Sequence, residues 1–228
     1  NIAANLGGML TPFGNPQNLF LYNKFQIPNM EFIQIMLPPF MVSVALITIC
    51  CMIFVKPESL TMKYDIIILP VAKTVLYLCL FALSIFIVFR VIPYWIGLII
   101  ILIVLLFVDR SALKKVDYPL LLTFVFFFIF AGNVARIAIV KDFFSMLMKQ
   151  STLLFSILSC QVISNVPSAV LLSQFTENYH DLLLGVNIGG VGTLISSLAS
   201  LITFREYTSH NHGCGGYYLK VFTAFNVV

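Results

Sequence analysis

Long apolar runs are the feature that most restricts how this chain folds. Hydrocarbon about 30 Å thick needs roughly 20 apolar residues for each helical crossing, and six stretches reach or approach that length. A seventh begins at residue 217. A backbone inside lipid must satisfy its own hydrogen bonds, which favours helices. The six predicted crossings are residues 2–22, 31–55, 66–89, 93–108, 118–140 and 183–204.

The composition agrees with a lipid environment. Hydrophobic residues make up 60% of the chain and charged residues 10%, against about 25% charged in soluble domains. The mean hydropathy is +1.01. The net charge of +4 comes from Lys and Arg between the apolar runs, which suits loops at lipid headgroups and provides no basic stripe for nucleic acid. We therefore expect an all-α polytopic protein whose partner is the lipid bilayer.

One polar motif occurs twice, at a constant offset of 182 residues. Asn-Leu-Gly-Gly-Met-Leu-Thr at 5–11 returns as Asn-Ile-Gly-Gly-Val-Gly-Thr at 187–193. The alignment continues without a gap, so that Gly14 matches Ser196, Asn15 matches Ser197 and Asn18 matches Ser200. A single Gly-Gly pair can be only a close-packing face. Two corresponding interrupted segments indicate the binding site of a secondary transporter.

A second irregular region lies at residues 151–176. Residues 151–163 are apolar, Ser164-Asn-Val-Pro167 interrupts them, and residues 168–174 are apolar again. Each arm is too short to span the membrane alone. Two short arms around a polar tip predict a re-entrant helical hairpin, whose non-helical tip is tolerated only against protein or a water-filled cavity.

Loop charges predict the orientation of the segments. Loops 56–65 and 109–117 together carry Lys56, Lys63, Arg110, Lys114 and Lys115, whereas the opposite side offers Lys24 and Arg90. The excess places these two loops in the cytoplasm. The two motif copies then cross the membrane in opposite directions, as an inverted repeat requires.

The motifs and the placement of the acids favour an anion carrier. Breaks in a membrane helix free backbone carbonyls which, with Ser, Thr and Asn oxygens, suit Na⁺, while half-helix N-termini attract anions. All nine acidic residues lie at segment edges or in loops. A proton-exchanging antiporter usually needs a carboxylate within the membrane, so a sodium/proton antiporter is the alternative. A channel-like or structural subunit is a third reading. No nucleophile–base pair or metal set lies at one depth, so we expect no enzyme activity and no cofactor beyond Na⁺ as coupling ion.

Other polar residues have plainer readings. Lys73 and Arg136 could neutralise an anion, but both lie near segment ends, where snorkelling to the interface is the simpler account. His210, His212 and Cys214 resemble a metal cluster but sit in a Gly-rich loop without a fourth ligand. The chain begins inside the first motif and ends within an apolar run, so we expect a fragment of a longer protein.

At these motifs the chain resembles the ion transporter superfamily, which includes divalent anion/sodium symporters, citrate transporters and arsenite-pump permeases. The resemblance rests on Gly7-Gly8-x-x-Thr11-x-x-Gly14-Asn15-Pro16-Gln17-Asn18, on Ser164–Pro167 and on Asn187–Ser200. It implies an elevator-type carrier, often a homodimer, with a scaffold and a moving transport domain. By this analogy residues 1–22 are the broken helix of repeat 1, 23–117 are mainly scaffold, and 118–228 are repeat 2, with the hairpin, the broken helix 183–204 and the start of a last helix.

The resemblance also implies the site residues. Na⁺ would bind near Gly14 and Asn15, facing a first hairpin outside this sequence, and between Asn165 and Ser196. The small anion would lie between the hairpin tips. Its predicted contacts are Asn15, Pro16, Asn18, Ser164, Asn165, Val166, Pro167, Thr193 and Ser197.

Two departures from the dicarboxylate symporters bear on the substrate. The tip has Val166-Pro167 where those proteins continue Ser-Asn with Thr, and Ser196-Ser197 stands where they usually keep a Thr-Pro pair. The predicted activity is therefore Na⁺- or H⁺-coupled transport of a small anion in the bacterial cytoplasmic membrane, with the anion left open among carboxylates and oxyanions.

Overall fold

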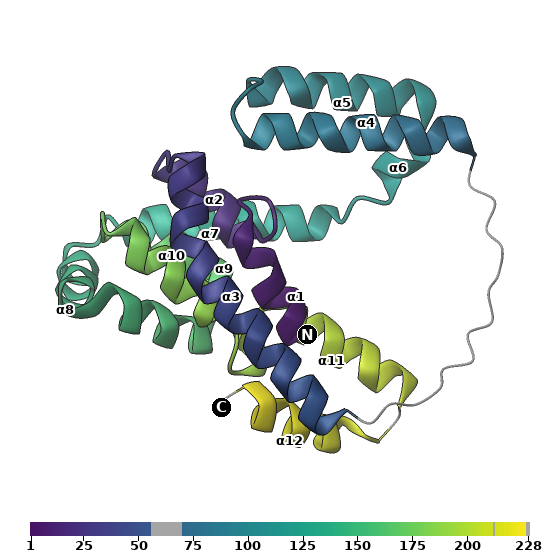
Figure 1. Cartoon of the computed structure of the whole chain (residues 1–228). Coiled ribbons are helices and arrows are strands. Elements are labelled where there is room, and N and C mark those ends of the chain that lie inside the picture. Colours follow the sequence, from purple (N-terminus) through teal and green to yellow (C-terminus); the bar gives the residue numbers. More distant parts are fainter. Residues whose placement is uncertain (56–69, 212, 227–228) are drawn as a thin grey trace. The chain divides into compact units, whose positions relative to one another are not determined.

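The computed structural model describes residues 1–55, 70–211 and 213–226, and within these residues every regular element is helical. The predicted all-α class is thus confirmed (Figure 1). The elements are α1 (Ile2–Gly7), η1 (Gly8–Leu10), α2 (Pro16–Lys24), α3 (Asn29–Phe54), α4 (Val71–Val88), α5 (Tyr94–Val108), α6 (Arg110–Lys114), α7 (Tyr118–Val134), α8 (Ala138–Ile163), α9 (Asn165–Leu172), α10 (Tyr179–Ile188), η2 (Leu194–Ser196), α11 (Leu198–His210) and α12 (Gly215–Asn226).

Three of these helices are long and apolar enough to cross a membrane, namely α3, α4 and α8, and α5 and α7 are shorter apolar helices. Large apolar side chains such as Met52, Phe81, Phe107 and Phe126 are exposed on them. Apolar surface on this scale is stable in lipid and not in water. The chain is therefore an integral membrane protein, as predicted.

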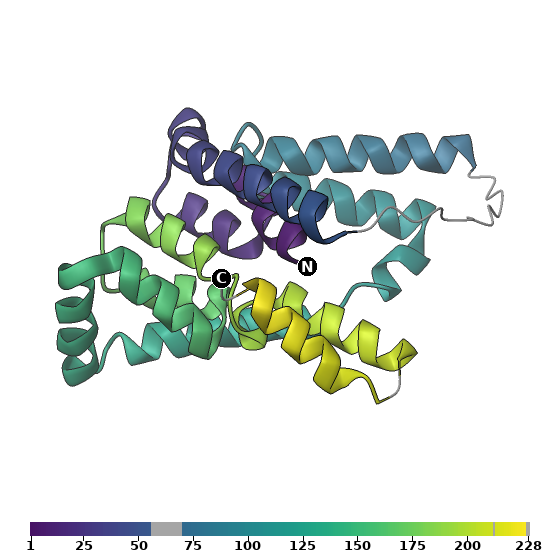
Figure 2. The ribbon, with the colours of Figure 1, turned by 60° about the horizontal axis from the view of Figure 1, so that its bottom comes forward.

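The chain forms two compact units. Residues 50–119 make the smaller one, in which α4 and α5 lie side by side (Figures 1 and 2). A Cβ atom on Gly97 of α5 would lie 2.2 Å from Cδ1 of Ile87 on α4, so the Ile87 side chain packs directly over this glycine. Both motif copies and the hairpin belong to the other unit, residues 1–49 and 120–228. The assignment of these parts to scaffold and transport domain stays a prediction.

In the larger unit, α8 and α10 pack through small residues. Ser156 and Cys160 of α8 are fully buried, and they face Gly185 of α10 and Gly189, the residue that directly follows α10. A Cβ atom on Gly185 would lie 2.6 Å from Cβ of Ser156, and one on Gly189 would lie 2.9 Å from Cβ of Cys160. Small residues spaced four apart on both helices let the backbones approach closely.

Two predicted boundaries were wrong. The crossing predicted over 118–140 ends at Val134, and a turn containing Arg136 separates it from α8, which begins at Ala138. The predicted four-residue tip of the hairpin is narrower, because Ser164 alone is non-helical and Asn165–Pro167 form the first turn of α9. Proline is tolerated in the first turn of a helix because an N–H at that position would have no intrahelical acceptor. The part of the predicted crossing 66–89 that precedes Pro70 lies outside the described residues.

Candidate functional site

The first motif interrupts its helix between Gly8 and Asn15. After η1 the backbone is extended at Thr11 (φ −121°, ψ 147°) and again at Asn15 (φ −139°, ψ 146°), and Pro16 then opens α2. A Cβ atom on Gly14 would lie 2.1 Å from the carbonyl oxygen of Gly8. Gly8 and Gly14 therefore hold the two ends of the break against each other, which no larger residue permits.

The second motif repeats this backbone shape at the equivalent positions. Thr193 (φ −74°, ψ 161°) and Ser197 (φ −147°, ψ 150°) are extended, like Thr11 and Asn15 in the first copy. η2 lies between them, and the Ser197 hydroxyl caps α11 by accepting from the N–H of Ser200 at 3.2 Å. At these two pairs of residues the sequence repeat is thus also a repeat of local structure.

The two motifs are hydrogen-bonded to each other in opposite order. Asn1 Nδ2 lies 3.3 Å from the Ser200 hydroxyl, and Asn5 Nδ2 donates to the Ser197 hydroxyl at 2.7 Å. Further along the first copy, Asn18 Oδ1 accepts from Asn187 Nδ2 at 2.6 Å. Partners in the second copy fall from 200 to 187 as residue numbers in the first rise from 1 to 18. The two segments therefore run antiparallel to each other.

The hairpin tip lies against the second motif. Ser164 has φ 74° and ψ 157°, a backbone region that is nearly restricted to glycine. Its hydroxyl lies 3.4 Å from the carbonyl oxygen of Ser196. Asn165 is 4% exposed, and a Cβ atom on Gly190 would lie 2.8 Å from its Nδ2. Strain of about 1–3 kcal/mol at a non-glycine residue of this kind is typical of functional sites.

The structure brings several predicted site residues together around this tip. Ser164, Asn165 and Ser196 lie next to each other through the contacts above, and Val166 and Pro167 follow in the first turn of α9. In the first motif, Asn15 Nδ2 donates to the carbonyl of Asn5 at 3.0 Å. That acceptor is the main-chain carbonyl, whereas the Asn5 side chain donates to the Ser197 hydroxyl and, at 3.3 Å, to the Gly190 carbonyl. Asn5 therefore links the two breaks.

Asn18 differs from the other predicted site residues. It is fully buried, and its amide group bonds only to protein: Nδ2 donates to the carbonyl of Met9 at 3.2 Å and approaches that of Gly8 at 3.4 Å, while Oδ1 accepts from Asn187. Asn187 Nδ2 also donates to the Leu183 carbonyl at 2.8 Å. These bonds give Asn18 a structural role, and its contact with the substrate stays a prediction.

Gln161 is the residue that the sequence analysis missed. Its Nε2 donates to the carbonyl of Gly189 at 2.8 Å, and its Oε1 accepts from the N–H of Thr193 at 2.8 Å. The Thr193 hydroxyl in turn donates to the Gln161 main-chain carbonyl at 3.0 Å. A lone glutamine in an apolar run carries no spacing signal, so nothing in the sequence marks it.

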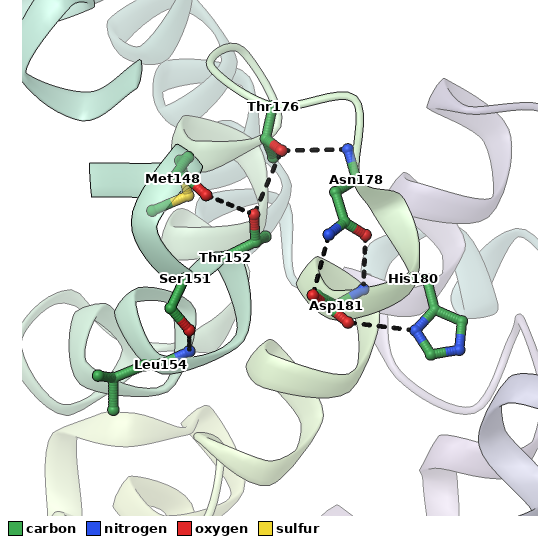
Figure 3. Close-up of polar contacts among 8 residues, drawn as sticks. All are labelled: Met148, Ser151, Thr152, Leu154, Thr176, Asn178, His180 and Asp181. Carbon is green, nitrogen blue, oxygen red and sulfur yellow. Dashed lines mark hydrogen bonds and ion pairs between the residues drawn. The ribbon is translucent and has the colours of Figure 1, made fainter. Parts of the chain in front are cut away.

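The open end of the hairpin is fixed by a separate polar network (Figure 3). Ser151 interrupts α8 with φ −164° and ψ 100°, and its hydroxyl accepts from the N–H of Leu154 at 3.2 Å. The Thr176 hydroxyl lies 3.4 Å from that of Thr152 and accepts from the N–H of Asn178 at 3.1 Å. A hollow of about 320 Å³ beside Thr152 and Thr176 lies at this end and not at the tip.

Neither broken segment, residues 1–22 or 183–204, contains an Asp, Glu, Lys or Arg. The predicted candidate Lys73 pairs instead with Asp109, Nζ to Oδ2 3.4 Å, at the end of α5. Hydrogen bonds from the Ser111 and Tyr77 hydroxyls, and then the Lys73 charge, hold the pKa of Asp109 well below its usual range. No three His, Cys, Asp or Glu side chains among residues 1–55, 70–211 and 213–226 are grouped to hold a metal ion. His212, one of the loop residues considered above, lies outside the described residues.

Comparison with known proteins identifies the family. The sequence model of the family described as Citrate transporter matches residues 1–181. The chain belongs to the citrate transporter family. That span contains the first motif, the hairpin and the start of α10, and it ends before the second motif.

Two curated proteins are similar to this citrate transporter family member. "Uncharacterized transporter MJ0456" of Methanocaldococcus jannaschii is 37% identical over 204 residues, which are 90% of this chain and 56% of that protein. "Inner membrane protein YbiR" of Escherichia coli is 31% identical over 216 residues, again 90% of this chain and 56% of that protein. The chain thus spans about half the length of these relatives. No solved structure matches it significantly.

Proposed function

We propose that this chain forms the transport core of a secondary carrier for a small anion, coupled to Na⁺ or H⁺. The observation that carries the proposal is the pair of equivalent breaks, at 8–15 and 189–197, which pass each other in opposite order beside the hairpin tip. Freed carbonyls and hydroxyls at such breaks are suited to a bare cation, and half-helix N-termini are suited to an anion.

The opposite order of the paired residues supports an inverted repeat, and the short arms around Ser164 support a re-entrant hairpin. Alternating access would then consist of a movement of the motif-bearing unit as one body, as in an elevator mechanism, in a homodimer in the cytoplasmic membrane. The family description makes citrate the first anion to test, and other carboxylates and oxyanions follow. A sodium/proton antiporter is the second candidate, and the absence of a carboxylate from both motifs in the described residues speaks against it.

Uptake by the full-length parent protein in proteoliposomes tests the proposal. Citrate, succinate, sulfate and arsenite are offered with and without an inward Na⁺ gradient, while internal pH is recorded. Na⁺-stimulated uptake of one anion is the expected result, and acceleration by a pH gradient alone would assign H⁺ as the coupling ion. A Na⁺-driven change in internal pH with no anion movement would establish the antiporter and refute the anion carrier.

A variant at the hairpin tip tests the site. Asn165→Ala removes a buried amide beside Ser164 and Gly190, so we expect uptake to fall by at least about 100-fold, a loss of the size typical when a site's hydrogen-bonding group is removed. Asn23→Ala is the matched control, because Asn23 is exposed near the end of α2 and its side chain donates to the Leu19 carbonyl of the same helix. Equal uptake by both folded variants would show that Asn165 does not contact the transported species.

A further inference from the structure

We propose that Gln161 is a positioning residue of the transport site: it holds the Gly189–Thr193 break against the hairpin tip and thereby sets the affinity for ion and anion. The inference rests on the function proposed above and assigns a role to a residue outside the predicted site. It begins from the bonding needs of the break. A helix that stops at Ile188 leaves its last carbonyls without intrahelical partners, and the carbonyls and N–H groups of the break that follows need partners as well.

The Gln161 side chain satisfies both kinds of group at once. Its Nε2 donates to the Gly189 carbonyl at 2.8 Å and lies 3.4 Å from the Val191 carbonyl, while Oε1 accepts from the Thr193 N–H at 2.8 Å. Among side chains only an amide offers donors and an acceptor in this planar arrangement. The Gln161 side chain thus makes hydrogen bonds of the kind that peptide groups would make if the helix continued.

The backbone of the break is shaped around this side chain. Gly192 has φ +139°, and a Cβ atom there would lie 2.3 Å from Gln161 Oε1. The equivalent residue of the first motif is Leu10, which lies in η1 without a positive φ. The contact is therefore a property of the second motif and not of the repeat in general.

The position of Gln161 connects the break with the tip. Gln161 lies on α8, one helical turn before Ser164 and Asn165. It is hydrogen-bonded to Thr193 through both its side chain and its main chain, and Thr193 lies three residues before Ser196. Ser164 and Ser196 are themselves in contact. A change at Gln161 therefore shifts Ser196 relative to Asn165, which are the two residues of the second predicted Na⁺ site.

Gln161→Glu in the full-length parent protein tests the role, since the carboxylate keeps the length of the side chain and loses both N–H donors. Its oxygen would face the Gly189 carbonyl. Gln174→Glu is the matched control, because Gln174 follows the second arm of the hairpin, is exposed, and makes one long bond to its own helix, to Val170 at 3.4 Å. We expect KM for the anion and the half-saturating Na⁺ concentration to rise about ten-fold in Gln161→Glu, the loss typical for one to two hydrogen bonds. Vmax should stay within about two-fold, and Gln174→Glu should match the wild type.

Amide hydrogen exchange over residues 189–196 tests, without a transport assay, whether Gln161 holds the break in place. We expect exchange there to accelerate at least about ten-fold in Gln161→Glu, and also in the neutral Gln161→Met, with no change in Gln174→Glu. Unchanged exchange, or accelerated exchange with wild-type KM and Na⁺ dependence, would overturn the inference. So would failure of both Gln161 variants to fold, because the residue would then be purely structural. Wild-type protein that moves no anion would refute the proposed function instead. The exchange result would still decide whether Gln161 holds the break in place.

Discussion

The packing of α8 on α10 allows a prediction whose magnitude follows from the structure. Gly185→Ala places a Cβ atom 2.6 Å from Cβ of Ser156 and 2.9 Å from the carbonyl oxygen of Leu153. Ordinary contacts of a Cβ atom begin near 3.4 Å. The helices must then separate by about 0.8 Å, the difference between 3.4 and 2.6 Å. Neither obstacle can rotate away, because one is a Cβ atom and the other is backbone.

Gly132→Ala in α7 is the matched control. Both glycines lie in the last turn of a helix, and nothing lies within 4 Å of a Cβ atom on Gly132. The gain in helix propensity, up to about 1 kcal/mol, is similar for the two variants and cancels in their comparison. The remaining difference is the cost of overpacking, about 1–3 kcal/mol.

Thermal unfolding of the detergent-solubilised full-length protein, followed by fluorescence-detected size exclusion, measures this difference. On the scale of domains of 150–250 residues, 1 kcal/mol corresponds to roughly 2–4 °C in Tm. We therefore expect Gly185→Ala to melt roughly 2–12 °C below Gly132→Ala. Equal midpoints for the two variants would show that α8 and α10 are not in close contact at this point, and the small-residue packing would be refuted.

Three further predictions concern stability. Ser156→Ala should leave Tm unchanged or raise it by the equivalent of about 1 kcal/mol, because the buried hydroxyl has no hydrogen-bond partner in the described residues; a clear fall in Tm would reveal a partner. Asn18→Leu should lower stability by about 1–3 kcal/mol, because it leaves the buried Asn187 amide without one acceptor; a raised KM at unchanged Tm would restore the substrate role. Asp109→Asn should lower Tm equally at pH 7 and pH 5 and progressively less below about pH 4, because a carboxyl whose pKa is lowered on folding stabilises above its ordinary pKa and loses that effect as pH falls toward the folded value; a gap between wild type and variant that is as large at pH 2 as at pH 7 would contradict the ionic role.

Much of the fold could be predicted because the apolar runs depend on local composition. The runs at 31–55 and 93–108 correspond closely to α3 and α5, and the repeat located both interruptions. The α7–α8 boundary could not be found in this way, because the turn around Arg136 lies inside a sequence that is apolar on both sides. Hydropathy indicates whether a segment lies in lipid or in water, but it does not indicate where the segment turns.

The site was predictable to the extent that its residues recur or interrupt apolar sequence. Ser164, Asn165 and Ser196 do so, and the structure brings them together. Gln161 does neither, and its partners Gly189 and Thr193 lie 28 and 32 residues away. A contact of this kind is determined by how α8 packs on α10, so it becomes visible only once the helices are placed.

The two motif copies share a backbone shape but not their neighbours, and this difference bears on mechanism. A Cβ atom on Gly8 would lie 2.4 Å from Oδ1 of Asn15 in its own motif, whereas one on the equivalent Gly190 would lie 2.8 Å from Nδ2 of Asn165 on the hairpin. Gly8 therefore packs against a side chain of its own motif, and Gly190 packs against the tip of the hairpin. Under the proposed function, a displacement of the hairpin would change the surroundings of the second break while the internal Gly8–Asn15 contact of the first persists. An ion site built on the second break would then be coupled to movement of this hairpin.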